Sequence, residues 1–266
     1  MSHEPVAGRS GPKLTILMPV RNEGVNLRIM LKMLHAVVEV PCEVLIVHDT
    51  ADDDCLHLLP ELPRGQNVRL IHNTLGRGVV NAIKAGVQAA TGEYVLIFAA
   101  DEIGPVLAIE DMLTLMDEGC QLVSCTRYAH GGRRLGGSFI GGILSRSANR
   151  LFHLMAGTVL TDCTTGIKMF RRADFDSLQL ESRPVGWAVA FEIAIKAHLL
   201  GFSLGEVPVI SIDRLYGGKS TFKLPSWTVE YLRWFLWGLV RARQASRRNR
   251  TVLVRIPAST AIGGRG

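Results

Sequence analysis

Acidic side chains follow three short apolar runs of the chain. They are Glu23, Asp49, Asp53 and Asp101. Carboxylate oxygens accept hydrogen bonds from a nucleobase or a ribose, and together with phosphate oxygens they bind Mg²⁺ or Mn²⁺. If the apolar runs are parallel strands of one sheet, these acids follow the edge at which open α/β sheets bind their ligands. The pattern therefore predicts a site for a nucleotide, with or without a metal ion.

The segments that would position these acids alternate in type. Runs typical of buried strands stand at residues 14–18, 43–47, 68–71, 94–98 and 122–124. Between them, apolar residues recur at helical spacing over residues 23–38, 79–90 and 109–117. Asn22 precedes the first predicted helix as a candidate cap, and Gly92 follows the second. Such alternation predicts right-handed βαβ units and a parallel sheet covered on both faces.

The second half of the chain is less regular. Residues 131–142 (GGRRLGGSFIGG) interrupt the alternation, and we expect them to form a long, mobile loop. Beyond this loop the spacing predicts helices near residues 143–155 and 188–200, a strand near 204–212 and a last helix near 226–240.

Composition excludes several classes of protein. With 266 residues, 47% of them hydrophobic, the chain can bury a large core and is not a disordered protein. Its five cysteines include no CxxC pair, which disfavours a zinc site or a disulfide framework and favours a reducing cytosol. The first residues carry no apolar signal segment, and no uncharged run reaches the roughly 18 residues of a spanning helix. We therefore expect a cytoplasmic protein.

The net charge of +6 comes mostly from an arginine-rich segment at residues 241–250. This segment follows Trp227, Tyr231, Trp234 and Phe235 of the last predicted helix. Aromatic residues followed by arginines are typical of a helix at the inner membrane face, but also of a helix packed on its own domain with a solvated basic tail. Both interpretations stay open. Nucleic-acid binding is disfavoured because basic and aromatic residues do not interleave on a known module.

Two nucleotide-binding motifs are absent from the sequence. No GxGxxG opens a helix after the first predicted strand, and GxxxxGK[ST] occurs nowhere in the chain. A dinucleotide-dependent oxidoreductase and a P-loop enzyme are therefore both disfavoured.

Six segments between about Leu14 and Leu224, in this order, resemble glycosyltransferase family 2, and most closely its polyprenyl-phosphate (dolichol-phosphate mannose synthase-like) sugar transferases. LTILMPVRNEGVNL is similar to the PxxNE segment, EVLIVHDTADDDC to the DDxSxD loop, and LGRGVVNAIKAGVQAATGEYVLIFAAD to the helix that leads into the DxD strand. SCTRYAHGG resembles GSRYxxGG, TDCTTGIKMFRR resembles DxTSGFxxxxR, and DRLYGGKSTFKL resembles DRxxGxSK. His48 replaces the first acid of the DD pair, and Ala99 replaces the first acid of DxD.

The resemblance implies an α/β fold with one GT-A (Rossmann-like) domain at residues 13–225, in which helices flank a mostly parallel sheet. It leaves a flexible N-terminus at residues 1–12, an amphipathic aromatic and basic helix at 226–250, and a tail at 251–266. No feature of the sequence indicates an oligomeric state.

The same resemblance implies roles for individual residues. A nucleoside-diphosphate sugar would be bound by Pro19, Val20, Glu23, Asp49, Asp53, Gly76, Gly78, Ala100, Asp101 and Arg127. Asp101 would bind Mg²⁺ or Mn²⁺, and Arg127, Arg214 and Lys219 would hold phosphates. Asp162 and Glu192 are the remaining candidate acids, and in relatives that act on hydroxyl groups an acid from this half of the chain deprotonates the acceptor.

Three functions are consistent with these residues. The first is an inverting transferase that moves a hexose from a GDP-mannose-type or UDP-glucose-type donor to a polyprenyl phosphate. The second is a soluble transferase that acts on a hydroxyl group of a small molecule, glycan or protein, with Asp162 or Glu192 as the base. The third, suggested by His48 and Ala99, is a catalytically weakened subunit that binds nucleotide sugars.

Overall fold

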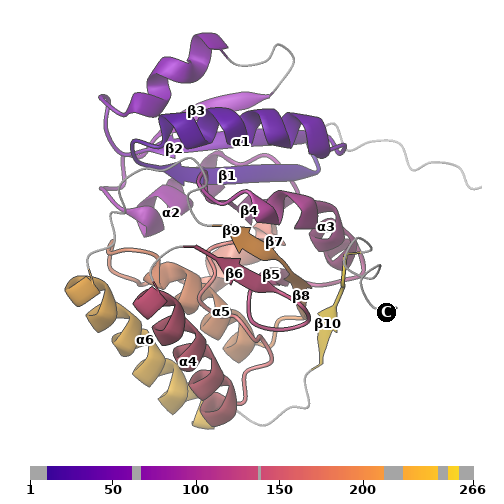
Figure 1. Ribbon diagram of the computed structural model, residues 1–266, viewed down its shortest axis with the longest axis vertical. Coiled ribbons are helices and arrows are strands. Elements are labelled where there is room, and N and C mark those ends of the chain that lie inside the picture. Colours follow the sequence, from indigo (N-terminus) through magenta and orange to yellow (C-terminus); the bar gives the residue numbers. More distant parts are fainter. Residues whose placement is uncertain (1–10, 62–66, 137–138, 213–223, 245–250, 258–266) are drawn as a thin grey trace, which may run out of the picture.

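The computed structural model describes residues 11–61, 67–136, 139–212, 224–244 and 251–257 (Figure 1). The described strands are β1 (Leu14–Val20), β2 (Cys42–His48), β3 (Val68–His72), β4 (Tyr94–Ile97), β5 (Leu122–Thr126), β6 (Arg133–Leu135), β7 (Lys168–Arg171), β8 (Leu204–Pro208), β9 (Ile210–Ile212) and β10 (Val252–Val254). The described helices are α1 (Gly24–Val37), α2 (Val79–Ala89), α3 (Ile109–Asp117), α4 (Phe139–Ala156), α5 (Ala188–Leu200) and α6 (Leu224–Gln244), with 3₁₀ helices η1 (Asp54–Glu61), η2 (Gly104–Ala108) and η3 (Arg172–Leu178).

Most strands belong to one sheet with the order β10-β8-β5-β7-β4-β1-β2-β3. Strand β7 is antiparallel to both of its neighbours, β4 and β5, and the other pairs of described strands in this sheet are parallel. The carboxyl ends of the parallel strands therefore meet at one edge, and the amino end of β7 lies at that same edge. Strands β6 and β9 form a separate two-stranded sheet.

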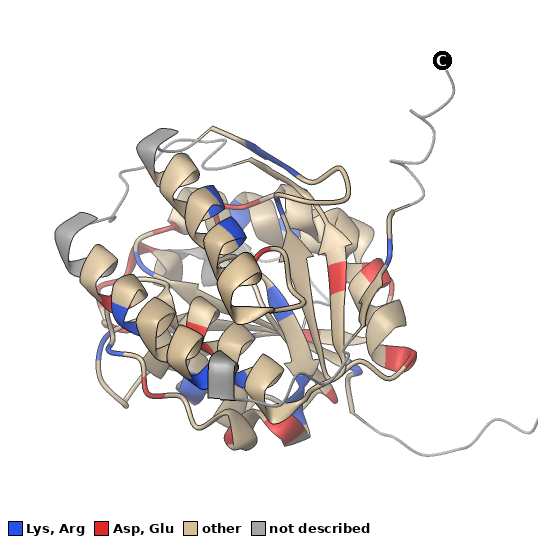
Figure 2. Cartoon of the chain, turned by 90° about the horizontal axis from the view of Figure 1, so that it is seen from below, with Lys and Arg blue, Asp and Glu red and all other residues tan. Residues whose placement is uncertain are grey.

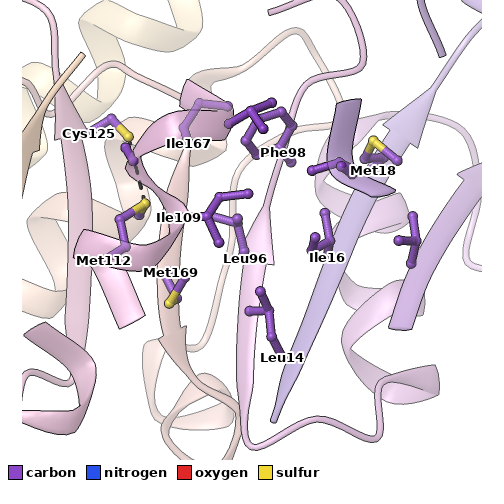
Figure 3. Packing of buried hydrophobic residues seen from close by; sticks show 14 of the residues in the cluster. Leu14, Ile16, Met18, Leu96, Phe98, Ile109, Met112, Cys125, Ile167 and Met169 are labelled. Carbon is purple, nitrogen blue, oxygen red and sulfur yellow. Dashed lines mark hydrogen bonds between the residues drawn. The ribbon is translucent and has the colours of Figure 1, made fainter. Parts of the chain in front are cut away.

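The sheet is buried on both faces. Leu14, Ile16 and Met18 of β1 pack in one cluster with residues of α1 and α3, and Figure 3 shows them beside Leu96 and Phe98. The other face packs against α2, α4, α5 and α6. Because successive strand residues point to opposite faces, a strand covered on both faces appears as an unbroken apolar run.

Helix α2 lies very close to the sheet. A Cβ atom at Gly86 would come within 2.4 Å of a methyl group of Leu17, so only glycine permits this approach. The same helix begins directly after Gly78, and the close packing fixes where that helix start lies relative to the edge of the sheet.

The glycine-rich segment departs from the sequence-based expectation. Instead of one loop over residues 131–142, the structure has strand β6 and the first turn of α4 within this range. Arg133 pairs with Ile210 and Leu135 with Ile212, so β6 forms because β9 offers it a partner that lies far along the chain.

The predicted strand near residues 204–212 and the predicted tail at 251–266 also differ. The strand is divided at Val209 into β8 and β9, which belong to different sheets. Residues Val252–Val254 join the large sheet as β10 beside β8, and Arg255 donates a hydrogen bond of 2.6 Å to Asp111 on α3. Part of the predicted tail is thus a component of the fold.

The start of α1 also differs from the prediction. Glu23, not Asn22, is the N-cap residue of α1, while Asn22 has a positive φ of 54°. Within the described residues, no helix combines the length and the apolar content that crossing a bilayer requires.

Candidate functional site

Asp49 joins two loops at the carboxyl edge of the sheet. One of its carboxylate oxygens accepts a hydrogen bond from the amide of Asn73 at 2.7 Å, and the other accepts one from the backbone N–H of Gly78 at 2.9 Å. Gly76 and Gly78 have φ angles of 103° and 116°, a region that favours glycine. The loop after β2 is thereby fixed to the turn that precedes α2.

Asp53 fixes the turn between β1 and α1. Its carboxylate accepts hydrogen bonds from the backbone N–H of Asn22 at 3.1 Å and of Cys55 at 3.0 Å, and Asp54 accepts one from Gly24 at 2.9 Å. Asp53, Asp54 and Cys55 place ligand atoms within 4.8 Å of one another. Because burial raises the pKa of the Cys55 thiol, the thiol is protonated at neutral pH and is a poor ligand for a hard cation.

The end of β1 contributes Pro19 and Val20, and Val20 stands opposite His48 of β2. Glu23 accepts a hydrogen bond of 2.8 Å from Asn26 at the start of α1. The buried ring of His48 donates from Nδ1 to the carbonyl of Thr50 at 2.9 Å and stacks on His72, with ring centroids 5.2 Å apart. A histidine pair therefore stands at the position where the family pattern has an acid.

Asp101 lies in the turn that follows β4. Its side chain is half-buried, and Ala100 beside it is buried. In the same turn Glu102 accepts a hydrogen bond from the hydroxyl of Ser211 on β9. A Cβ atom at Gly104 would lie 1.7 Å from the carbonyl oxygen of Ile210, so the chain passes directly against β9 here. The small sheet thus supports the turn that carries Asp101.

Arg127 and Asp162 form a buried ion pair at the carboxyl end of β5. Nε of Arg127 donates to Oδ2 of Asp162 at 2.7 Å, and Nη2 donates to Oδ1 at 3.0 Å. Burial by itself raises the pKa of Asp162, but the Arg127 guanidinium outweighs it and holds this pKa below its usual range. Asp162 is therefore ionised and holds the guanidinium in one orientation.

Helix α4 extends this cluster with polar side chains. The amide of Asn149 donates to Asp162 at 3.2 Å, and the hydroxyl of Tyr128 donates to Ser145 at 2.9 Å. Arginines lie over the ring of Tyr128, with Cζ of Arg127 at 5.1 Å and Cζ of Arg146 at 5.4 Å from its centroid. Two guanidinium groups are thereby gathered around one aromatic ring at the edge of the sheet.

Two buried charged residues of this region were missed in the sequence-based analysis. Lys168 is fully buried and donates to Ser124 at 3.1 Å, and burial lowers its pKa to about 8. Glu206 is also fully buried and accepts a hydrogen bond of 2.7 Å from the backbone N–H of Thr161, and burial raises its pKa to about 7. A charged residue within a short apolar strand was the signal that could have revealed both.

Glu192 binds a different segment from Asp162. Its carboxylate accepts hydrogen bonds from the backbone N–H of Glu181 at 2.5 Å and of Ser182 at 2.8 Å, and Lys196 lies 2.8 Å away. The two candidate bases, Asp162 and Glu192, therefore bind different segments and do not form one cluster. Arg214 and Lys219 lie outside the described residues.

The family model for "Glycosyl transferase family 2" matches residues 15–179. The chain is 25% identical to the polyprenol monophosphomannose synthase of Mycolicibacterium smegmatis, over 85% of this chain and 91% of that protein. It is 24% identical to the dolichol-phosphate mannosyltransferase of Pyrococcus furiosus, over 83% of this chain and 62% of that protein.

Solved structures with the same fold include glucosyl-3-phosphoglycerate synthase from Mycobacterium tuberculosis in complex with Mg²⁺ and uridine diphosphate. It matches with a TM-score of 0.66 and 17% identity over 98% of each chain. TarS from S. aureus in complex with UDP-GlcNAc matches with a TM-score of 0.59 and 17% identity, over 85% of this chain and 66% of that one. The expected GT-A fold is thereby confirmed, and the match to the family model, which covers more than half of the chain, shows that this protein is a glycosyltransferase that belongs to family 2.

Proposed function

We propose that this glycosyltransferase moves a hexose from a nucleoside-diphosphate sugar to a polyprenyl phosphate, with inversion at the anomeric carbon. The observation that carries the proposal is the pair of guanidinium groups of Arg127 and Arg146 around Tyr128. Guanidinium groups bind phosphate through their N–H donors. Nε and Nη2 of Arg127 already donate to Asp162 and Thr164, so Arg127 would reach a phosphate through Nη1, and Arg146 would add its own guanidinium. The two arginines lie at the same carboxyl edge of the sheet as the loops of Asp49 and Asp101. An anionic acceptor bound to them would therefore lie near the donor. The curated relatives named above have the same class of acceptor in their names.

The donor would bind at the loops after β1, β2 and β4. Mg²⁺ commonly takes one or two carboxylates and completes its octahedron with substrate phosphates and water. Asp101 offers one carboxylate, and Ala99 offers no second one, so the residues present fit a metal held largely by the diphosphate. Such a metal neutralises the charge that develops on the departing nucleoside diphosphate.

The bonds of Asp162 and Glu192 favour this acceptor over a hydroxyl group. Asp162 is fully buried and already accepts both guanidinium bonds of Arg127, and Glu192 accepts backbone N–H groups elsewhere. A hydroxyl acceptor needs a base with an available lone pair. A phosphate is already anionic near neutral pH and needs only to be positioned. We therefore assign Asp162 to positioning Arg127, and we retain Arg214 and Lys219 as further phosphate-binding residues.

A lipid acceptor also fits the surface of α4 and α6, which pack side by side. The rings of Phe152 and Phe235 are 5.5 Å apart, and a Cβ atom at Gly238 would come within 2.9 Å of Phe152. The outer sides of the two helices expose Ile143, Leu144, Leu151, Leu154, Met155, Val229, Leu232, Leu236 and Val240. We name these nine residues the α4–α6 face.

Basic residues accompany the α4–α6 face. Figure 2 looks onto the two helices and shows basic positions, in blue, along both of them, and all of these are arginines. Arg146, Arg150, Arg233 and Arg241 are exposed there. Exposed apolar side chains with surrounding arginines suit an anionic bilayer surface, on which the acceptor phosphate lies at headgroup level. We therefore propose peripheral contact with the inner membrane face through this surface.

The direct test is a transfer assay with the full chain, Mg²⁺ or Mn²⁺, and a short polyprenyl phosphate in detergent. Labelled GDP-mannose and UDP-glucose are supplied separately, and the label that enters the organic phase is counted. Transfer from one donor that stops when EDTA is added is the expected result. Label in a water-soluble product instead would indicate a hydroxyl acceptor. Nucleotide binding without transfer to any acceptor would indicate a binding subunit.

A further inference from the structure

The segment at residues 179–187, between η3 and α5, is held by charged side chains from three helices. Its first two residues offer their carbonyl oxygens, Gln179 to Lys196 of α5 at 2.5 Å and Leu180 to Lys84 of α2 at 2.9 Å. The next two offer their N–H groups to Glu192 of α5.

Arg183 then donates its N–H to Glu230 of α6 at 3.1 Å. Each of the five residues 179–183 thus makes a backbone hydrogen bond to a charged side chain. Hydrogen bonds to charged groups are about twice as strong as neutral ones, so this segment is fixed in place although it has no regular secondary structure.

The segment touches the loops on both sides of the candidate site. Pro184 packs on Gly78, where an added Cβ would come within 2.6 Å of the Pro184 Cβ. Gly78 is the residue whose backbone N–H donates a hydrogen bond to the carboxylate of Asp49. Trp187 packs on Gly166, where an added Cβ would come within 2.8 Å of the six-membered ring of the indole.

Gly166 in turn follows Thr164 by two residues, and the hydroxyl of Thr164 accepts a hydrogen bond of 3.0 Å from Arg127. Pro184 therefore touches the loop proposed for the donor, and Trp187 touches the loop that supports the proposed acceptor arginine. The transferred sugar is joined to the donor diphosphate and is attacked by the acceptor phosphate, so it must lie between these two groups.

Trp187 has the properties needed to contact that sugar. Trp234 on α6 is 2% exposed, whereas Trp187 keeps part of its surface open to solvent. An indole offers a flat apolar surface on which the C–H side of a pyranose ring can pack, while the hydroxyl groups of the sugar stay hydrated. Glycine at position 166 leaves the ring room to lie against the backbone.

We propose that Trp187 is a sugar-binding residue, against which the hexose of the donor packs during transfer. The proposal rests on the proposed function, because it needs a nucleoside-diphosphate sugar as the ligand. Trp187 would then also determine specificity. Because the 179–187 segment holds the indole ring in a fixed place, hexoses whose C–H face fits against the ring are bound in preference to the others.

The test separates the sugar from the nucleotide. Dissociation constants for GDP, GDP-mannose, UDP and UDP-glucose are measured by calorimetry with Mg²⁺ for the wild type, Trp187→Phe and Trp187→Leu. Phe202→Leu is the matched control, because Phe202 is a partly exposed aromatic residue that precedes β8 at the opposite edge of the sheet. We expect Trp187→Leu to weaken binding of the accepted nucleotide sugar by about three- to tenfold and to leave the parent nucleotide unchanged.

Trp187→Phe should retain most of the affinity for the nucleotide sugar. This variant also keeps the test decisive if Trp187→Leu fails to fold. In the wild type the nucleotide sugar should change tryptophan emission more than the parent nucleotide does, and in Trp187→Phe this difference should vanish. Equal weakening of nucleotide and nucleotide sugar, or no weakening of either, would overturn the sugar contact. If the wild type binds no nucleotide at all, the proposed function fails first, and the two failures are thereby distinguished.

Discussion

The guanidinium of Arg127 and the carboxylate of Asp162 face each other in parallel, with donor and acceptor atoms 2.7 and 3.0 Å apart. Residue 162 lies in the loop before β7, and residue 127 lies directly after β5. The pair therefore joins two loops whose strands run in opposite directions, and it does so with side chains that are 12% and 0% exposed. At this depth, removal of either charge leaves the other buried without a partner, which is strongly destabilising.

Asp162→Asn should destabilise the protein by about 3–5 kcal/mol, because it leaves the Arg127 cation buried without its counter-charge. Urea unfolding at neutral pH gives the free energy of unfolding. Glu118→Gln is the control, since Glu118 lies 3.9 Å from Arg255 and is 51% exposed, and an exposed pair contributes less than about 1 kcal/mol. Similar losses in the two variants would contradict a structural role for the buried pair.

Glu206 should make stability fall as the pH rises from 5 to 7. Its pKa in the folded protein is about 7, above the ordinary 4.5, so in this range the folded state holds a proton that the unfolded state has lost. The slope contributed by one such group is at most about 1.4 kcal/mol per pH unit. In Glu206→Gln this contribution should be absent from urea unfolding measured at pH 5, 6 and 7.

The control for this pH series is Glu43→Gln. Glu43 is buried too, but hydrogen bonds from Thr91 and Thr15 outweigh its burial and lower its pKa, so it stays ionised from pH 5 to 7 in both states. The Glu43→Gln variant should retain the wild-type slope. A Glu206→Gln variant with the same slope as the wild type would show that Glu206 is ionised in the folded protein.

Asp101→Asn should remove the effect of Mg²⁺ on nucleotide binding. We expect the wild type to bind nucleotide more tightly with Mg²⁺ than with EDTA, and the variant to bind equally in both, because an amide is a far weaker metal ligand than a carboxylate. Turnover should fall by orders of magnitude. Asp52→Asn, which removes an exposed charge from the loop after β2, should keep the Mg²⁺ effect. A Mg²⁺ effect that survives in Asp101→Asn would place the metal elsewhere.

The α4–α6 face should bind anionic vesicles. Sedimentation with vesicles of phosphatidylglycerol and phosphatidylcholine should decrease in a Leu232→Ser, Leu236→Ser double variant, because both leucines are exposed on α6. Leu107→Ser removes an equally apolar side chain from η2, where it is 67% exposed, and should sediment like the wild type. A chain cut after Val240 would be a poorer test, because it also removes β10 from the sheet. Equal sedimentation of all variants would contradict membrane contact through this surface.

Gly78→Ala should be more harmful than Gly119→Ala. Both glycines have positive φ, 116° and 106°, so both substitutions incur backbone strain of order 1 kcal/mol. At Gly119 nothing lies within 4 Å of the added Cβ, whereas at Gly78 it meets Pro184. Thermal unfolding and nucleotide affinity should both be reduced further in Gly78→Ala. Equal effects in the two variants would show that the contact with Pro184 is loose.

The sequence predicted the elements that alternate regularly, and local patterns explain why. Residues 14–18 and 94–98 are apolar because both faces of the sheet are covered, and β1 and β4 are found there. The placement of Asp49 and Asp101 after strands followed directly from these runs. These predictions needed no information about contacts far apart in the chain.

What could not be predicted depends on pairing between distant residues. Strand β6 is only three residues long and exists because β9 lies beside it. The ion pair of Arg127 and Asp162 joins residues 35 positions apart, and no local pattern indicates that one neutralises the other. The local pattern marks Lys168 as a charged residue in an apolar strand, but its complete burial results from β7 lying between β4 and β5.

Strand β7, which is antiparallel to both of its neighbours, also divides the large sheet. On one side of β7 lie β4, β1, β2 and β3 with the loops proposed for the donor, and on the other lie β5, β8 and β10 with Arg127 at the end of β5. Within the described part of the large sheet, β7 is the one strand that joins these halves. Within the sheet, any twisting of one half against the other therefore passes through the four residues of β7, so the backbone of this strand helps to set the spacing between donor and acceptor.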